Sequence, residues 1–402
     1  MPGPGFYWMG EEEKKEVLDV LASGYLFRYG QFSDPAFKAK TFTLEQEFAR
    51  QCGVAHCVAS ASGTSSLLMA LHALDLSPGY EVIVPAYTFV ATYSAIVFSG
   101  GIPVLAEIDD SLTLDPADVE RRITPRTRAI MPVHMLGNPC DMDGIMAVAR
   151  RHGLPVIEDA CQANGATYHG RRVGAIGEMG AFSLNIFKTI SAGDGGLLVT
   201  DDRDLYERAF AFHDQGHTPN RGGVEVGRRN TLGLNFRMNE LTAAVALAQL
   251  RKSDRMVATL REKKRRFREA IGDVPGMRYR TLHDPDGECA TLLTVFFDSA
   301  DRAAAVADRL NTTTVAHSGW HVYSNMEHVL AFLREHGRPH AIGAYPRTDD
   351  LLARAINLSV GVVDRGLGAA FGINITSTDG EIHQAAATFR GAVAPVRVGP
   401  ST

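Results

Sequence analysis

The sequence has few cysteines and no cysteine motif. Its five cysteines, Cys52, Cys57, Cys140, Cys161 and Cys289, are odd in number, scattered, and never spaced as Cys-x-x-Cys. Such a set favours neither a disulfide framework nor a tetrahedral zinc site, and it is typical of proteins in a reducing compartment. We therefore expect no bound metal ion and a cytoplasmic location.

The chain also lacks an excess of positive charge and any long apolar run. Its formal net charge is −5, and the arginine-rich run at 261–266 is interleaved with acids, as on a solvated helix face. No apolar stretch approaches the length of a membrane span, and residues 1–8 lack the basic head of a signal peptide. The sequence therefore predicts neither a nucleic acid nor a membrane as partner.

Several sequence signatures of common enzyme folds are absent. The glycines at 174, 177 and 180 do not form Gly-x-Gly-x-x-Gly, and there is no Gly-x-x-x-x-Gly-Lys-Ser/Thr. Neither a Gly-x-Ser-x-Gly elbow nor a His-Glu-x-x-His pair is present. These absences exclude the usual fingerprints of dinucleotide-binding folds, phosphate-binding loops, serine hydrolases and zinc proteases.

The chain of 402 residues can bury a large core and is long enough for two domains. From about residue 40 to 250, short apolar segments alternate with helical patterns, which favours a mostly parallel sheet covered on both faces. Strands are expected at 56–60, 81–85, 102–105, 129–133 and 154–158, and helices near 67–74, 116–122 and 142–152.

A long helical pattern at 239–271 ends this region, and the pattern then changes. A strand is expected at 290–297, with helices at 301–310 and 329–336. We therefore predict an α/β large domain over residues 1–254 and a smaller α+β domain over residues 255–402.

Two titratable residues suggest the chemistry. Lys188 stands between a short apolar run and a glycine-rich turn, and Asp159 follows the apolar residues of an expected strand. A lysine against a buried wall loses its proton more readily and becomes an amine nucleophile, while a nearby acid can hold a cationic ring nitrogen. Both demands describe pyridoxal phosphate. The ordinary alternatives are a surface lysine and an acid that caps the next helix.

A phosphate group and a planar ring need further residues. The run Ser-Ala-Ser-Gly-Thr-Ser-Ser at 60–66 lies between an expected strand and a helix, where backbone N–H groups and the helix dipole favour an anion. Within it, Gly63 allows close approach and Thr64 offers a hydroxyl. Phe89 follows another strand and could stack on the ring. A serine-capped turn and a core phenylalanine are the ordinary alternatives.

Several ordered motifs resemble the sugar and cyclitol aminotransferases of the DegT and StrS family. They are Glu-Asp-Ala-Cys-Gln-Ala-Asn-Gly-Ala from 158, Phe-Ser-Leu-x-x-x-Lys from 182 with Gly-Asp-Gly-Gly from 193, and Gly-Leu-Asn-Phe-Arg-Met-Asn-Glu from 233. The likeness is close over residues 12–250. Members are fold-type I enzymes that use pyridoxal phosphate, so the resemblance implies that fold and that cofactor.

The resemblance also implies roles for residues at matching positions. Lys188 would hold the cofactor as an imine and then shuttle the proton, and Asp159 would pair with the pyridine nitrogen. Gln162 would lie near the ring hydroxyl, and Phe89 would stack on the ring.

Other matching positions concern the phosphate and the assembly. Gly63, Thr64 and Ser183 would hold the cofactor phosphate. In the family the residue matching Asn235 reaches the phosphate from the neighbouring subunit, which implies a homodimer with shared active sites.

The implied reaction moves an amino group from glutamate or glutamine to a keto-sugar or keto-cyclitol, in amino-sugar or aminocyclitol biosynthesis for a secondary metabolite or a polysaccharide. A lyase on the same fold, such as a sugar dehydratase, is an alternative, but there a histidine typically replaces the lysine. A non-catalytic regulator is a second alternative.

The substrate region departs from the family pattern. Where members commonly carry Arg-x-x-aromatic for a nucleotide, residues 319–326 run Gly-Trp-His-Val-Tyr-Ser-Asn-Met. This favours a cyclitol ketone or an unusual sugar. Tyr25, His321 and Tyr323 are candidate substrate contacts, with packing as the alternative for each.

Overall fold

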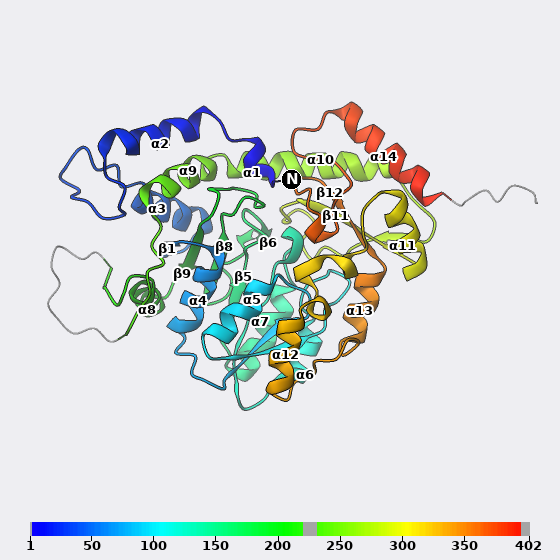
Figure 1. The fold of residues 1–402 in the computed structure, drawn as a ribbon, viewed down its shortest axis with the longest axis horizontal. Helices are drawn as coiled ribbons and strands as arrows, with labels where there is room; N and C mark the ends of the chain where they lie inside the picture. The colour runs from blue at the N-terminus through cyan, green and yellow to red at the C-terminus, as the bar shows by residue number, and fades with distance from the viewer. Residues whose placement is uncertain (1, 220–230, 395–402) are drawn as a thin grey trace, which may run out of the picture.

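The structure, a computed structural model, describes residues 2–219 and 231–394. Its centre is a mostly parallel β-sheet (Figure 1). Two sets of strands, in the orders β3-β2-β4 and β5-β8-β9-β1, are joined by parallel bridges from Ile130 to Val156 and from Val133 to Asp159. Among these strands β9 runs antiparallel to both neighbours, and the other pairings are parallel. The strands are β1 (His56–Ser60), β2 (Glu81–Pro85), β3 (Ile102–Ala106), β4 (Thr127–Ile130), β5 (Ile157–Asp159), β8 (Met179–Ser183) and β9 (Gly196–Thr200).

The mostly parallel sheet confirms the predicted α/β fold. Its strands are almost continuously buried, as expected for a sheet with helices on both faces. A two-stranded ribbon, β6 (Thr167–Tyr168) and β7 (Arg171–Arg172), lies apart from it. The helices of this part are α1 (Pro4–Tyr7), α2 (Glu11–Ser23), α3 (Lys40–Cys52), α4 (Gly63–Ala73), α5 (Val90–Phe98), α6 (Pro116–Arg122), α7 (Met142–His152) and α8 (Arg203–His213), with the 3-10 turn η1 (Met135–Gly137).

The long helical pattern at 239–271 forms two helices, not one. Helix α9 (Glu240–Leu250) is almost wholly buried, whereas α10 (Ser253–Ile271) buries one face only. The break falls at Lys252, whose Nζ donates to the carbonyl of Trp8 at 2.7 Å and lies 2.6 Å from the carboxylate of Glu13. Periodicity alone could not predict the break, because the two helices are both regular and their partners are distant in sequence.

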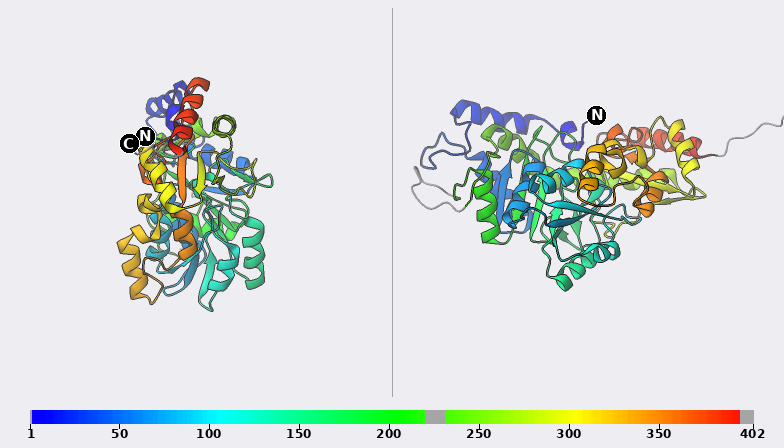
Figure 2. Two further views of the ribbon diagram at one scale, coloured as in Figure 1. Left: turned by 90° about the vertical axis from the view of Figure 1, so that its right-hand side faces the viewer. Right: turned by 60° about the horizontal axis from the view of Figure 1, so that its bottom comes forward.

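The C-terminal part has its own antiparallel sheet, in the order β10-β11-β12, and this sheet lies with the C-terminal helix at one end of the molecule (Figure 2). Its elements are β10 (Met277–Tyr279), α11 (Ala300–Arg309), β11 (Leu292–Phe297), α12 (Glu327–Glu335), α13 (Pro346–Ala353), β12 (Ala355–Ser359) and α14 (Asp379–Val393), with 3-10 turns η2 (Val315–His317), η3 (Gly319–His321), η4 (Tyr323–Asn325) and η5 (Arg365–Leu367). The predicted strand and helices of this part are present within three residues. The domain boundary at residue 254/255 stays a prediction.

One C-terminal segment reaches back to the large sheet. The backbone at Val322 forms an antiparallel bridge with Tyr87, and Thr88 N donates to the carbonyl of His321 at 2.9 Å. This contact brings turn η3 beside the loop that follows β2. The C-terminal part therefore supplies one wall of the space over the sheet.

Candidate active site

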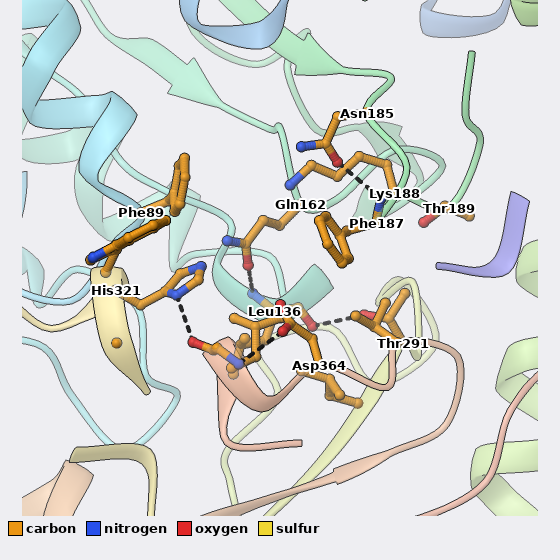
Figure 3. A pocket seen from close by; sticks show the side chains of 16 residues that line it. Phe89, Leu136, Gln162, Asn185, Phe187, Lys188, Thr189, Thr291, His321 and Asp364 are labelled. Carbon is orange, nitrogen blue, oxygen red and sulfur yellow. Dashed lines mark hydrogen bonds between the residues drawn. The ribbon is translucent and has the colours of Figure 1, made fainter. Parts of the chain in front are cut away.

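Two adjoining cavities meet at Lys188, at the carboxyl edge of the sheet, and Figure 3 shows the lining of the larger one. The smaller has a volume of about 130 Å³ and the larger of about 410 Å³. Both are lined by Phe89, Gln162, Asn185 and Lys188. A group held in the smaller cavity would thus present its reactive end to the larger one at the lysine.

Lys188 lies in the turn after β8, and this turn is held by local hydrogen bonds. Lys188 N donates to the carbonyl of Asn185 at 3.0 Å, and the side chain of Asn185 accepts from Phe187 N at 3.0 Å. Burial lowers the pKa of the Lys188 amine, and the nearby carboxyl groups of Asp159 and Asp364 partly offset this. A lowered pKa increases the fraction of the amine that is deprotonated, which is the form that a nucleophile or a general base requires.

The N-terminal segment supports the same turn from outside. Gly3 N donates to the carbonyl of Ile186 at 2.8 Å. A Cβ on Gly3 would lie 2.4 Å from the backbone of Phe187, and one on Gly5 would lie 2.8 Å from Ser191 N. Only glycine fits such a close approach, so residues 3–5 pack directly on the lysine turn.

Asp159 ends strand β5 and points into the smaller cavity. It is 4% exposed; its Oδ1 accepts from Cys161 N at 3.1 Å and its Oδ2 accepts from Thr92 Oγ1 at 2.8 Å. Since Thr92 uses its only hydrogen on Asp159, the 2.8 Å contact between Thr88 and Thr92 has Thr88 as donor. These two hydroxyls hold the carboxylate in an orientation that faces the smaller cavity, where it could pair with a cationic ring nitrogen.

The residue before it, Glu158, anchors the strand from below and was not singled out in the sequence. Its buried carboxylate accepts from His134 Nε2 at 2.9 Å and from the backbone N–H groups of Gly174, Ile176 and Gly177 at 2.6–2.7 Å. These donors supply the partners that a buried charge needs. Glu158 therefore holds the strand end that carries Asp159.

The start of helix α4 forms the other end of the smaller cavity. Ser62 caps the helix by accepting from Ser65 N at 3.1 Å, and Gly63 and Thr64 line the cavity in the first turn. A Cβ on Gly63 would lie 2.8 Å from both Cys161 Sγ and Ser183 Cβ. The free N–H groups and dipole of this helix suit an anion, as expected.

Phe89 and Gln162 lie between the two ends of the site. Phe89 is the N-cap residue of α5, and its ring lies 5.2 Å from that of His321, centroid to centroid. Gln162 is held by Leu136, whose N–H donates to its Oε1 at 3.0 Å. Figure 3 shows both side chains facing the space beside Lys188.

The structure thus brings together the predicted catalytic Lys188 and six of the seven predicted cofactor-binding residues, and it leaves Asn235 outside. Asn235 is exposed, pairs through its backbone with Asp214, and accepts from Arg237 N at 3.3 Å. It lines neither cavity of its own chain. Its predicted reach into a neighbouring subunit stays a prediction.

The three candidate substrate residues lie in different places. His321 lines the larger cavity, and burial lowers its pKa to about 4, so the imidazole is neutral near pH 7. Tyr25 lies outside both cavities and donates to Asp34. Tyr323 is fully buried, donates to Asp349 at 3.0 Å, and also lines neither cavity. The backbone turns between η3 and η4, which directs His321 and Tyr323 to different sides.

The sequence did not single out other walls of the larger cavity. Trp320, which is 66% exposed, lies at its edge, and Asp364 and Thr291 lie opposite Lys188. Thr291 Oγ1 donates to the carbonyl of Leu136 at 3.4 Å. Trp320 belongs to the unusual stretch at 319–326 that the sequence did mark. Thr291 directly precedes strand β11 and Asp364 follows strand β12, and no sequence motif surrounds either residue.

This donor set fits pyridoxal phosphate. One amine, one anchored carboxylate, an aromatic face and a helix N-terminus line the same small cavity, and the glycine at position 63 leaves room where a Cβ would collide. The sheet and this site together define the class of fold-type I enzymes that depend on this cofactor.

Comparison with known proteins agrees. The model of the DegT/DnrJ/EryC1/StrS aminotransferase family matches residues 8–363. The spore coat polysaccharide biosynthesis protein SpsC of Bacillus subtilis is 35% identical over 356 residues, which are 85% of this chain and 89% of that protein. L-glutamine:2-deoxy-scyllo-inosose aminotransferase of Streptoalloteichus tenebrarius is 42% identical over 54% of this chain, and the match spans only 53% of that protein.

The fold matches solved structures over nearly its whole length. DesV of S. venezuelae superposes with a TM-score of 0.79 at 30% identity, covering 96% of this chain and 95% of the other. The chain belongs to the DegT/DnrJ/EryC1/StrS aminotransferase family. It is a sugar or cyclitol aminotransferase that depends on pyridoxal phosphate.

Proposed function

We propose that this enzyme takes an amino group from glutamate or glutamine and places it on the ketone of a cyclitol or an uncommon sugar, in two successive half-reactions at one site. The relative named for L-glutamine and 2-deoxy-scyllo-inosose supports the donor and the cyclitol. The observation that carries the proposal is the position of Lys188, where the small cavity opens into the larger one.

The residues of the small cavity would each have one task. When bound, the cofactor supplies an electron sink for the carbon next to the transferred nitrogen. Asp159 would keep the ring nitrogen protonated through a charge-assisted hydrogen bond. Gly63, Thr64 and Ser183 would hold the phosphate, and Phe89 would fix the plane of the ring.

Lys188 would first hold the cofactor covalently and then move a proton. Its amine would take the proton from the α-carbon of the donor and return it at C4′ of the cofactor, a general base role worth roughly 10²–10⁴ in rate. Burial, which lowers the pKa of this amine, favours the free base that the first transfer needs. The presence of lysine here favours transamination over the dehydratase alternative.

The larger cavity would bind the donor and the ketone in turn. Its walls are mainly apolar, and Asp364, His321 and Thr291 are the polar groups on the side away from the cofactor residues Gln162, Asn185 and Lys188. A neutral imidazole and a carboxylate can accept hydrogen bonds from ring hydroxyls, so a polyhydroxylated ring fits this wall.

A homodimer with shared sites is part of this proposal. Large apolar side chains of α2, the following loop and the start of α3 are 37–71% exposed and form the N-terminal apolar patch: Leu18, Leu21, Leu26, Phe27, Phe32 and Phe42. Such a patch marks an interface, and the guanidinium of Arg237, two residues from Asn235, lies over the ring of Phe27 at 5.3 Å. A second copy on this patch would cover the segment that carries Asn235.

A cytoplasmic location also stays a prediction. In the described part of the chain, no helix is long and apolar enough to span a bilayer.

Borohydride trapping followed by a single-turnover spectrum tests the reaction. The enzyme is loaded with pyridoxal phosphate, reduced and digested, and we expect the adduct on Lys188, whereas Lys188→Arg should carry none. The unreduced enzyme is then mixed with each amino acid and challenged with keto-cyclitols and keto-sugars. An adduct on another lysine, or a spectrum that no ketone restores, would contradict the proposal.

A further inference from the structure

A third cavity lies outside the active site, between helix α10 and the start of the small sheet. Its volume is about 500 Å³. Strand β11 separates it from the catalytic space, because Leu292 lines the cavity at Lys188 and the next residue, Leu293, lines this one. We name it the α10 cavity.

The α10 cavity is lined by an excess of cations. Five basic side chains face three acidic ones along its wall, a difference of +2: Arg261, Lys264, Arg265, Arg268 and Arg280 against Glu262, Asp286 and Glu288. The rest of the chain is net acidic. A positive cavity on an acidic protein attracts a small anion more specifically than it attracts a polyanion such as nucleic acid.

At the inner end, two buried cations share one carboxylate. Lys264 Nζ lies 2.5 Å and Arg280 Nη2 lies 3.7 Å from Glu288 Oε2, and all three residues are at least 91% buried. Burial lowers the pKa of Lys264 to about 8, although Glu288 opposes this. One positive charge is therefore left uncompensated where the solvent screens it poorly.

At the outer end, Arg268 has no acidic partner among the described residues. Its guanidinium lies 4.4 Å from the ring centroid of Tyr279. By contrast, Arg265 donates to both Glu262 and Glu269. In the same described part of the chain, the buried Arg280 Nε and Tyr279 Oη also lack a hydrogen-bond partner.

We propose that the α10 cavity binds a small multivalent phosphate-type anion, such as diphosphate, separately from the cofactor. The excess of two charges matches a multivalent anion, and the exposed Arg268 presents a guanidinium group suited to phosphate oxygens. Arg280 adds one donor that is unpartnered among the described residues, its Nε, since its terminal nitrogens already donate to the carbonyls of Met135 and Leu136. The volume of about 500 Å³ accommodates an anion of this size. The proposal does not depend on the identity of the ketone or of the amino donor.

Calorimetric titration of the cofactor-loaded enzyme with diphosphate, at constant ionic strength, tests the proposal. We expect saturable binding with one site per chain, and a loss of about tenfold or more in affinity in Arg268→Gln, which removes one charge-assisted contact. Arg266→Gln is the matched control. It lies on the same helix, is also exposed, and pairs with Glu262 and Asp379 without lining the cavity.

The proton balance gives a second measurement. An anion beside Lys264 raises its pKa, so binding near pH 8 should take up a fraction of a proton, seen as a dependence of the heat on buffer ionisation enthalpy. Lys264→Met should abolish this uptake. Binding without uptake in the wild-type enzyme would place the anion elsewhere and overturn the proposal.

Three ligands distinguish the source of the phosphate groups. Equal affinity for diphosphate and a nucleoside diphosphate supports a free anion, and tighter binding of the nucleotide supports a nucleotide ligand. Equal affinity of an uncharged nucleoside would overturn the proposal, as would the absence of saturable binding or equal losses in Arg268→Gln and Arg266→Gln.

Discussion

Replacement of Thr92 by valine removes the hydroxyl that orients Asp159 and keeps the shape of the side chain. Thr92 is 1% exposed, and its hydroxyl donates to Asp159 Oδ2 at 2.8 Å while accepting from Thr88. A hydrogen bond to a charged group contributes about 1.5–3 kcal/mol, and the lost partner of the Thr88 hydroxyl adds about 1 kcal/mol. We therefore expect Thr92→Val to lower the free energy of unfolding by about 2–4 kcal/mol.

Urea unfolding of the cofactor-free enzyme at one fixed protein concentration measures this loss directly. The midpoint should fall at unchanged slope, because the surface exposed on unfolding is the same. Thr92→Ser is the control, since it keeps the hydroxyl, and should retain most of the stability. In the loaded enzyme Thr92→Val should also bind the cofactor more weakly, because Asp159 is less well oriented. A change below about 0.5 kcal/mol, within the range of a surface substitution, would refute the reasoning.

Three further outcomes follow from the site. Gly63→Ala should cost about 1–3 kcal/mol of stability and weaken cofactor binding, as followed by fluorescence titration, because its Cβ would lie 2.8 Å from Cys161 Sγ. Burial lowers the pKa of His321 to about 4, below its ordinary 6.5, so the neutral side chain stabilises the folded state fully above pH 6.5. This contribution to the free energy of unfolding, about 3 kcal/mol at most, is lost as the pH falls towards 4. The free energy of unfolding of His321→Asn, measured by urea titration at each pH, should lack that dependence on pH. Gly3→Ala should shift the pH at which the visible cofactor band changes, since its Cβ would press on the backbone of Phe187 beside the lysine.

The sequence predicted the residues whose signal is local. Asp159 ends strand β5 and Lys188 lies in the turn that follows β8, and the motif around each is short enough to be recognised along the chain. Thr92 was missed because its partner is 67 residues away, and nothing near it marks a hydroxyl as important. Asp364 and Thr291 were missed for the same reason, since only the return of the C-terminal part to the large sheet places them opposite the lysine.

The same distinction explains the misplaced residues. Tyr323 and His321 were predicted as substrate contacts from the same unusual stretch, 319–326. Part of that stretch does line the larger cavity, through Gly319, Trp320 and His321. Side-chain direction, however, depends on two 3-10 turns separated by the extended residue Val322, and the sequence does not specify such turns. The break between α9 and α10 has a similar origin, because the contacts of Lys252 with Trp8 and Glu13 join segments more than 200 residues apart.

The arrangement of the walls separates the chemistry from the choice of ketone. Every described residue that lines the smaller cavity belongs to the segment 62–195, whereas Trp320, His321 and Asp364 add the outer wall of the larger cavity from residues 319–367. Among the described residues, these three form no hydrogen bond with Asp159 or with the turn of Lys188. Substitution of Asp364 by asparagine should therefore alter the ketone half-reaction in a single-turnover spectrum and leave borohydride trapping at Lys188 unchanged. Equal damage to both would mean that the outer wall also positions the lysine, and that specificity and chemistry are not separable in this enzyme.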